Sequence, residues 1–193
     1  TNNKNIHLFP NYLDINSNEA AEKKNYIVYS GRISKEKGLE ELIDSFLNSE
    51  LSNLSLKILG NGPLLNYLKN KYPQSNVEFL GEVDNTQSLE IIKNSTAVVT
   101  ATKLYEGQPT LLCEASLMSV PSIFPKTGGI EEFFPKNYEL SFEQFNYDDL
   151  LKKLNLLKDQ QFLKTIGEKN NKFVSNVLSK ENLLNTFEEV IHG

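Results

Sequence analysis

Cysteine is almost absent from this 193-residue chain, which has only Cys113. A single cysteine excludes an intramolecular disulfide framework and makes a reducing cytoplasm the expected compartment. Histidine occurs only as His7 and His192, near opposite ends of the chain, and no Cys, His, Asp or Glu cluster has metal-ligand spacing. The sequence also lacks a G-x-S-x-G nucleophile elbow. Catalysis by a metal ion or by a protein nucleophile therefore has no support in the sequence.

Long hydrophobic runs and excess positive charge are also missing. No apolar run approaches the roughly 18 residues of a membrane-spanning helix. The first 14 residues lack the charged start, apolar middle and small-residue cleavage site of an export signal. The chain has 20 Lys+Arg against 25 Asp+Glu, a formal net charge of −5. Because nucleic-acid surfaces need clustered basic residues, we expect no nucleic-acid partner.

Short β-branched or apolar runs alternate with stretches of helical spacing, which predicts a parallel sheet covered by helices. The expected strands are residues 25–30, 54–59, 77–80, 96–101, 121–124 and, as a short sixth strand, 138–142. The expected helices between them are residues 36–48, 63–72, 86–95 and a helix that begins near residue 109. We therefore predict one α/β domain, a doubly wound Rossmann-like fold with about six parallel strands.

The ends of the chain have a different character from its middle. Residues 1–24 are rich in asparagine and are expected to form a connection with one strand, IHLF (6–9). Residues 25–142 would hold the sheet, and residues 143–193 would form two or three closing helices. Doubly wound sheets bind ligands at the carboxyl ends of their strands, so the loops there should carry the function.

The loop after the first strand, SGRISKEKGLEEL, contains two cations. Arg32 and Lys37 lie around the N-terminus of the next helix, and Gly31 and Gly38 permit tight backbone paths. Cationic side chains and helix N-termini both attract phosphate oxygens. The sequence thus suggests a phosphate site here, with ordinary solvated charges as the alternative.

Two further loops contain closely spaced glycines. Gly60 and Gly62 in LGNGPL either bring backbone close to a ligand or simply turn the chain into a helix with Pro63 at its first position. Gly128 and Gly129 in FPKTGGIEEFF either offer N–H groups to an anion or form a flexible turn. Neither loop matches a dinucleotide-binding fingerprint or a P-loop.

Glu106 and Glu114 flank the start of an apolar helix in YEGQPTLLCE (105–114). Pro109 suits the first position of that helix. Because the helix is apolar on almost every side, we expect it to be buried inside the domain. An ionised Glu114 in such a helix is costly without a hydrogen-bond partner, so a partner is expected.

Taken in order, these motifs resemble the C-terminal domain of family-four retaining glycosyltransferases, two-domain GT-B-type enzymes that use nucleotide-sugar donors. The segments that carry the resemblance are PNYLD, GRISKEKG, LGNGP, VEFLGEV, EGQPTLLCEA and PKTGGIEEF. They begin at residue 10, and the resemblance continues to the last helices. The E-x(7)-E spacing of Glu106 and Glu114, in register with Arg32 and Lys37, is its most specific part.

The resemblance implies a role for each site residue. The catalytic residues would be Arg32, Lys37 and Glu106. The two cations would neutralise charge on the leaving nucleoside diphosphate. Glu106 would accept hydrogen bonds from the transferred sugar and Glu114 from the ribose, with a salt bridge to a core-facing Lys or Arg as the alternative for Glu114. The Gly128–Gly129 turn would give N–H groups to phosphate. The implied donor-binding residues are Gly31, Arg32, Lys37, Gly60, Gly62, Glu106, Gly107, Gln108, Pro109, Thr110, Glu114, Gly128 and Gly129.

Three positions depart from the family pattern. Gly107, Gln108 and Pro109 stand where G-F-G or G-F-P is common, and this difference is expected to tune sugar specificity. Ser119 replaces a frequent glycine, and Tyr12 replaces the glycine of the family's P-N-G-V-D segment. The chain also begins where the family's N-terminal acceptor domain would end, so we expect a fragment that binds donor and transfers nothing alone.

The resemblance implies sugar transfer from a nucleoside diphosphate sugar to a glycan or lipid-linked acceptor in cell-surface polysaccharide synthesis. The implied partners are the donor and the N-terminal domain, and peripheral association with the inner face of the membrane would occur through that domain. No metal or other cofactor is implied, because the nucleotide sugar is a substrate.

Three other functions remain as alternatives. A dinucleotide-dependent oxidoreductase is disfavoured because SGRISKEKG lacks a glycine fingerprint. A non-catalytic domain that binds nucleotide sugars would share this fold. So would a GT-B-type epimerase or phosphorylase, although we identify no lysine motif suited to the pyridoxal cofactor of a phosphorylase.

Overall fold

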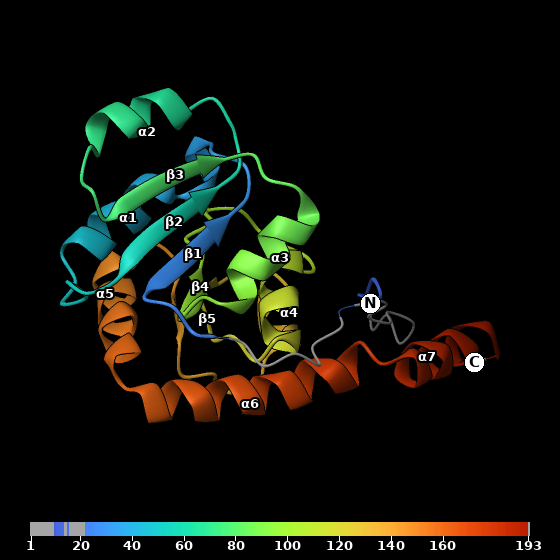
Figure 1. The fold of residues 1–193 in the computed structure, drawn as a ribbon. Helices are drawn as coiled ribbons and strands as arrows, with labels where there is room; N and C mark the ends of the chain where they lie inside the picture. The colour runs from blue at the N-terminus through green and yellow to red at the C-terminus, as the bar shows by residue number, and fades with distance from the viewer. Residues whose placement is uncertain (1–9, 14, 16–21, 193) are drawn as a thin grey trace.

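The computed structural model describes residues 10–13, 15 and 22–192, and its centre is one parallel sheet (Figure 1). The sheet has six strands in the order β3-β2-β1-β4-β5-β6, and every neighbouring pair is parallel. The strands are β1 (Tyr26–Ser30), β2 (Ser55–Leu59), β3 (Val77–Gly81), β4 (Ala97–Val99), β5 (Ser122–Lys126) and β6 (Ser141–Glu143). This arrangement confirms the predicted doubly wound fold.

Helices cover both faces of the sheet, which is why its central strands are apolar throughout. The α-helices are α1 (Leu39–Leu47), α2 (Leu65–Lys71), α3 (Asn85–Lys93), α4 (Thr110–Leu117), α5 (Tyr147–Asn155), α6 (Gln160–Val177) and α7 (Lys180–His192). Short 3₁₀ helices are η1 (Lys35–Lys37), η2 (Ile130–Phe133) and η3 (Leu156–Lys158). Helices α1 and α5 pack together on one face, and α3 and α4 lie on the other (Figure 1).

Two helix starts differ from the sequence-based expectation. Pro109 has φ −85° and ψ 87°, so it precedes α4 as its N-cap residue and does not occupy the first helical position. Pro63 and Leu64 form a turn, and α2 begins only at Leu65. The expected helix over residues 36–48 is divided into η1 and α1 by Gly38, whose φ of +65° no helical residue adopts.

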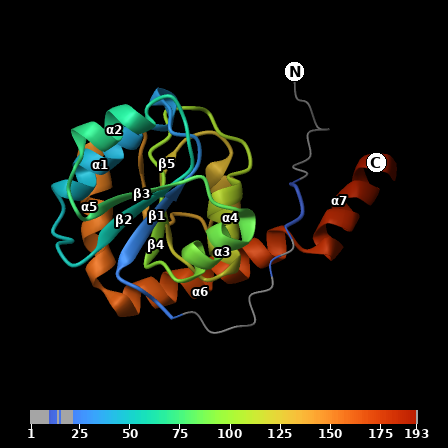
Figure 2. The same cartoon turned by 45° about the horizontal axis from the view of Figure 1, so that its top comes forward.

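The C-terminal part forms three α-helices, in agreement with the predicted two or three. Helix α6 packs against α4, and Asn170 of α6 is fully buried there with its Nδ2 bound to Ser116 Oγ. Helix α7 projects away from the body of the domain in both views (Figures 1 and 2). No helix in the described part of the chain has the length and apolar character needed to cross a membrane. The expected strand IHLF lies outside the described residues.

The position of the site follows from the strand order. The chain leaves β1 toward β2 on one side of the sheet, whereas β4 lies on the other side of β1. The connections that follow β1 and β4 therefore lead in opposite directions along the sheet, and this reversal is where doubly wound sheets bind ligands. Fully buried Ile27, Val28 and Val98 fix the two strands, each contributing about 1.5–3 kcal/mol of hydrophobic burial.

Candidate functional site

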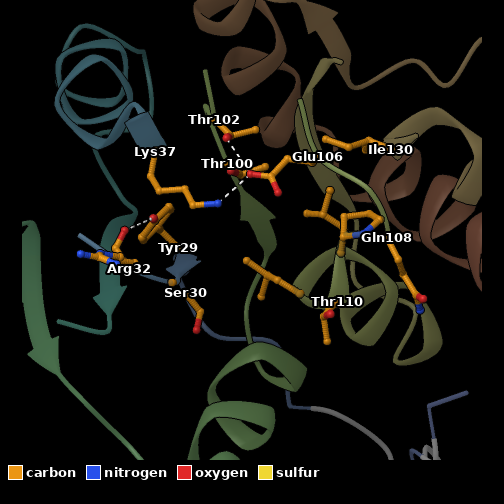
Figure 3. Close-up of a pocket in the computed structure, with 14 residues that line it drawn as sticks. Tyr29, Ser30, Arg32, Lys37, Thr100, Thr102, Glu106, Gln108, Thr110 and Ile130 are labelled. Carbon is orange, nitrogen blue, oxygen red and sulfur yellow. Dashed lines mark hydrogen bonds and ion pairs between the residues drawn. The ribbon is translucent and has the colours of Figure 1, made fainter. Parts of the chain in front are cut away.

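A cleft of about 400 Å³ opens at this reversal, between the loops that follow β1 and β4 (Figure 3). The first turn of α4 and Ile130 of η2 complete its wall. Seven of the predicted donor-binding residues line it: Gly31, Arg32, Lys37, Glu106, Gln108, Pro109 and Thr110. The other six, Gly60, Gly62, Gly107, Glu114, Gly128 and Gly129, are not among its lining residues.

The carboxylate of Glu106 receives two hydrogen bonds at one oxygen. Lys37 Nζ lies 2.7 Å from Glu106 Oε1, and Thr102 Oγ1 donates to the same oxygen at 2.8 Å (Figure 3). Burial raises the pKa of Glu106, but the hydrogen bonds from Lys37 and Thr102 and the charge of Lys37 outweigh it, so the pKa is lowered overall. Glu106 is therefore an ionised acceptor. Its Oε2 accepts no hydrogen bond from any other described residue.

A glycine brings the two loops close enough for this ion pair. A Cβ on Gly38 would lie 2.0 Å from the carbonyl oxygen of Ala101, well inside van der Waals contact. Beside it, the Lys103 N–H donates to the carbonyl of Glu36 at 2.8 Å. The loop after β1 thus packs directly on the loop after β4. This contact lets Lys37 reach Glu106, which is 69 residues away in the sequence.

Arg32 is exposed at the other end of the same loop. The hydroxyl of Tyr29 donates to the Arg32 carbonyl oxygen at 2.8 Å and holds the turn. Burial, followed by the charges of Glu106 and Glu36, raises the pKa of Tyr29, which therefore stays a neutral donor. Among the described residues, none forms a hydrogen bond or ion pair with the Arg32 guanidinium, so all five of its N–H groups can bind a ligand.

The Gly128–Gly129 turn supports Glu106 from behind. The Gly129 N–H donates to the Glu106 carbonyl oxygen at 2.8 Å. Gly128 has φ +59°, and a Cβ there would lie 2.0 Å from the same oxygen. The expectation that Gly129 offers a free N–H to phosphate is therefore wrong for this structure, because that group is already used to fix the Glu106 backbone.

Gly60 and Gly62 support the Arg32 loop in a similar way. A Cβ on Gly60 would lie 2.1 Å from the Gly31 carbonyl oxygen, and one on Gly62 would lie 2.2 Å from that of Ile33. The Ile33 N–H donates to the Asn61 carbonyl oxygen at 2.9 Å. The backbone that these glycines bring close is thus that of the neighbouring loop, and neither glycine lines the cleft.

Glu114 is half-buried on α4, one helical turn after Thr110, which lines the cleft. Burial raises the pKa of its carboxyl group. Within the described part of the chain, no lysine or arginine forms a salt bridge with it and no group donates a hydrogen bond to it. The alternative of a core-facing salt bridge is therefore not observed. Of the four charged groups expected to share a cleft, Arg32, Lys37 and Glu106 line it.

Among the cleft residues that sequence patterns missed, Tyr29 and Thr102 make hydrogen bonds to the Arg32 backbone and to the Glu106 carboxylate. Tyr29 lies within the buried strand NYIVYS, where an aromatic residue ordinarily indicates core packing. Thr102 lies four residues before Glu106, in a stretch that continues an apolar strand. The signal available in the sequence was a hydroxyl side chain, that of Thr102, four residues before the predicted functional carboxylate of Glu106.

The described residues contain no group of three His, Cys, Asp or Glu that could hold a metal ion.

The family model for glycosyl transferases group 1 matches residues 13–178. The chain belongs to this family. The matched region contains all six strands and every residue that lines the cleft. Membership confirms the predicted resemblance to a GT-B-type glycosyltransferase. Whether the anomeric configuration is retained stays a prediction.

Curated relatives of this group 1 chain include two polysaccharide glycosyltransferases. The amylovoran biosynthesis glycosyltransferase AmsD of Erwinia amylovora is 28% identical over 126 residues, which cover 64% of this chain and 36% of AmsD. The capsular polysaccharide biosynthesis glycosyltransferase CapM of Staphylococcus aureus is 26% identical over 185 residues, which cover 88% of this chain and 48% of CapM. The chain thus spans less than half the length of either relative.

Solved structures share the fold of this group 1 chain. A mutant of S. aureus TarM, crystallised with fondaparinux, alpha-GlcNAc-glycerol and UDP, matches with a TM-score of 0.83 and 19% identity, over 100% of this chain and 41% of TarM. The pneumococcal O-GlcNAc transferase GtfA, in complex with UDP and GlcNAc, matches with a TM-score of 0.73 and 19% identity, over 90% of this chain and 37% of GtfA. At these identities the likeness shows the fold alone.

Proposed function

We propose that this chain is the donor-binding domain of a retaining glycosyltransferase. The enzyme transfers a sugar from a nucleoside diphosphate sugar to a glycan or lipid-linked acceptor in the synthesis of a cell-surface polysaccharide. Membership of the group 1 family supports the reaction type. The biosynthetic roles in the names of AmsD and CapM support the class of product.

One observation carries the proposal: Lys37 and Arg32 both line the cleft at the reversal point of the sheet, and the Arg32 guanidinium has no hydrogen-bond or ion-pair partner among the described residues. Arg32 can bind two phosphate oxygens through parallel N–H groups. The Lys37 ammonium has three N–H groups, and its described contacts use one, toward Glu106. Arg32 and the two unused N–H groups of Lys37 can therefore bind a diphosphate, which competes with Glu106 for the charge of the Lys37 ammonium.

This arrangement suits the charge changes of glycosyl transfer. As the bond between the sugar and the diphosphate breaks, negative charge accumulates on the leaving diphosphate oxygens. Preformed cations stabilise that charge in the transition state at little cost of reorganisation. Glu106, ionised and held by Lys37 and Thr102, presents Oε2 to a hydroxyl of the transferred sugar. Glu114 accepts hydrogen bonds from the ribose hydroxyls.

The remaining components of the reaction belong to a longer protein. The chain covers less than half of AmsD and CapM, so we assign the acceptor site to a second domain that closes over the cleft. That domain also provides any association with the inner face of the membrane. UDP in the TarM and GtfA complexes makes uridine nucleotides the first donors to try.

Isothermal titration of the chain with UDP, GDP and ADP tests the proposal. We expect one of them to bind with a Kd below about 1 mM. Arg32→Gln and Lys37→Met should each weaken that binding by about 10-fold or more, since hydrogen bonds to charged groups contribute about 1.5–3 kcal/mol. Lys35→Gln, a matched loss of charge on the exposed residue at the start of η1, should change Kd by less than about twofold.

Two outcomes would contradict the proposal. One is the absence of binding of all three diphosphates at millimolar concentration. The other is an equal loss of affinity in Lys35→Gln and Lys37→Met, which would show that only general positive charge attracts the nucleotide.

A further inference from the structure

The side chain of Gln108 is bound to a segment 97 residues away in the sequence. The Asn11 N–H donates to Gln108 Oε1 at 2.6 Å, and Gln108 Nε2 donates to the Asn11 carbonyl oxygen at 3.0 Å. A single orientation of the carboxamide satisfies both hydrogen bonds. Gln108 therefore pairs with the Asn11 backbone as an adjacent strand residue would.

The segment that Gln108 holds is docked at several points. Pro10 is buried, and Leu13 packs against the hydrophobic core. The ring of Tyr12 lies 5.2 Å from the Nζ of Lys180, at the start of α7. Residues 10–13 thus connect the rim of the cleft with the beginning of the last helix.

Gln108 also belongs to the cleft wall. It lies two residues after Glu106, which faces the sugar end of the proposed donor, and two residues before α4 begins at Thr110. By contrast, Arg32 and Lys37 lie on the loop after β1. A change at Gln108 should therefore affect the sugar end of the cleft more than its diphosphate end.

We propose that Gln108 is a positioning residue that couples sugar binding in the cleft to docking of residues 10–13 on its rim. This inference rests on the proposed function of the cleft. The pair with Asn11 holds the loop of residues 106–109 and so orients Glu106 toward a sugar hydroxyl. A donor sugar that contacts this loop stabilises the pair in return, because a coupling free energy acts equally in both directions.

The first experiment measures the pair without any nucleotide. Amide hydrogen exchange at Asn11 is followed by NMR in the whole chain and in Gln108→Leu, which removes both hydrogen bonds. We expect exchange at Asn11 to become about 3- to 10-fold faster in the variant. Gln161→Leu, the same substitution on the exposed surface of α6, should leave it unchanged. Equal exchange in all three proteins would overturn the proposal.

The second experiment measures the coupling with UDP and with UDP-glucose or UDP-GlcNAc. In Gln108→Leu we expect the Kd of the UDP sugar that binds to rise about 3- to 10-fold and that of UDP to change by less than twofold. By reciprocity, the same UDP sugar should slow Asn11 exchange in the unsubstituted chain by the same factor. A purely structural role would weaken UDP and UDP sugars equally, and that result would overturn the coupling.

Gln108→Glu distinguishes pairing from simple side-chain bulk. The substitution keeps the size and the acceptor for the Asn11 N–H, but an ionised carboxylate cannot donate to the Asn11 carbonyl. We expect fast Asn11 exchange at pH 7 relative to the unsubstituted chain, and recovery near about pH 4, where the introduced group is protonated. No recovery would contradict the pairing. Failure of every nucleotide to bind would overturn the proposed function and the coupling, while the exchange data would still establish or exclude the pair.

Discussion

Lys37 and Glu106 bind each other at 2.7 Å within the cleft where each is proposed to bind a different part of the donor. Their side chains are 27% and 29% exposed, so water weakens the pair and a ligand can reach both partners. A diphosphate would compete with Glu106 for the ammonium of Lys37. At Oε2 of Glu106 the sugar hydroxyls would compete with no other residue in the described part of the chain. Glu114, the second carboxylate of the E-x(7)-E motif, has no such cation beside it among the described residues. Glu106 and Glu114 therefore lead to different predictions.

Replacing Glu106 should separate diphosphate binding from sugar binding. In Glu106→Ala the ammonium of Lys37 is released and a negative charge near the diphosphate is removed, so UDP should bind about 3- to 10-fold more tightly. A UDP sugar loses its hydroxyl acceptor, so the ratio of its affinity to that of UDP should fall about 10-fold. Calorimetric titration measures both constants. As the control, Glu131→Ala removes an exposed charge from η2 and should leave this ratio of affinities unchanged. Weaker UDP binding in Glu106→Ala would contradict the competition between the diphosphate and Glu106 for Lys37.

Replacing Glu114 should stabilise the protein and weaken ligand binding. The raised pKa of Glu114 means that the folded state holds its proton more tightly than the unfolded chain does. The tighter binding of this proton stabilises the folded state at pH values below the unfolded pKa, and the stabilisation is lost as the pH rises through the folded pKa. Glu114→Gln should therefore melt about 1–3 °C higher at pH 7 and show no difference near about pH 4.

The same variant should bind UDP more weakly, because a neutral amide is a poorer acceptor for ribose hydroxyls than a carboxylate. Thermal denaturation and titration of one preparation measure both effects. Glu168→Gln, on the exposed surface of α6, is the control for loss of a charge. A lower melting temperature for Glu114→Gln at pH 7 would mean that the carboxylate has a stabilising partner.

Among the secondary-structure elements, the strands place the site and glycine turns bring its loops together. Gly38, Gly60 and Gly128 have positive φ angles and lie where a Cβ would meet a carbonyl oxygen of a neighbouring loop. Backbone of the loops after β1, β2, β4 and β5 is therefore in direct contact at the carboxyl edge of the sheet. The cleft wall is held by these contacts between loops as well as by the helices.

Gly128 and Gly81 form a matched pair for testing this feature. Both have positive φ, +59° and +76°, but a Cβ on Gly81 would meet no atom within 4 Å. Gly81→Ala should lose about 1–2 kcal/mol of stability through backbone strain. Gly128→Ala adds a collision with the Glu106 backbone and should lose about 2–5 kcal/mol in urea denaturation.

The two variants should also differ in ligand binding. Because Gly128 contacts the Glu106 backbone, Gly128→Ala should weaken binding of a UDP sugar more than binding of UDP. Gly81→Ala should leave both affinities unchanged. Equal stability losses in the two variants would show that the backbone of Glu106 moves away without cost.

At the scale of the whole molecule, the buried thiol of Cys113 can report on opening of the domain. Cys113 is the chain's only cysteine, it lies on α4 and it is fully buried. Burial, assisted by the charge of Glu114 and opposed by a hydrogen bond with Gln108, raises the pKa of Cys113 to about 12. Since the thiolate is the reactive form, a thiol reagent should modify Cys113 only when the domain opens.

Nucleotide binding should slow that modification. A ligand that binds only the closed domain lowers the open population by the factor 1 + [L]/Kd, which is about 11-fold at ten times Kd. The rate of modification at pH 8, followed by absorbance with a chromogenic disulfide, should fall accordingly. Arg32→Gln should lose the effect at the same UDP concentration. A rate independent of UDP in the unsubstituted chain would show that opening at α4 is not linked to the cleft.

Hydrophobic periodicity determined the sheet, its six strands and the sequence of its helices, because burial on both faces forces each central strand to be apolar throughout. It located helix ends less well. Pro63 and Pro109 both satisfied the rule for a first helical position, yet each lies before its helix, because local preference does not fix where a chain leaves a turn.

The loop sequences placed Arg32, Lys37 and Glu106 at one edge of the sheet, since the carboxyl ends of parallel strands share that edge. Only the tertiary structure decided their partners. The pairing of Lys37 with Glu106, the use of the Gly129 N–H and the bond between Gln108 and Asn11 all join residues of different loops or turns. Such contacts depend on how closely two backbones approach, and neither residue type nor spacing along one segment contains that distance.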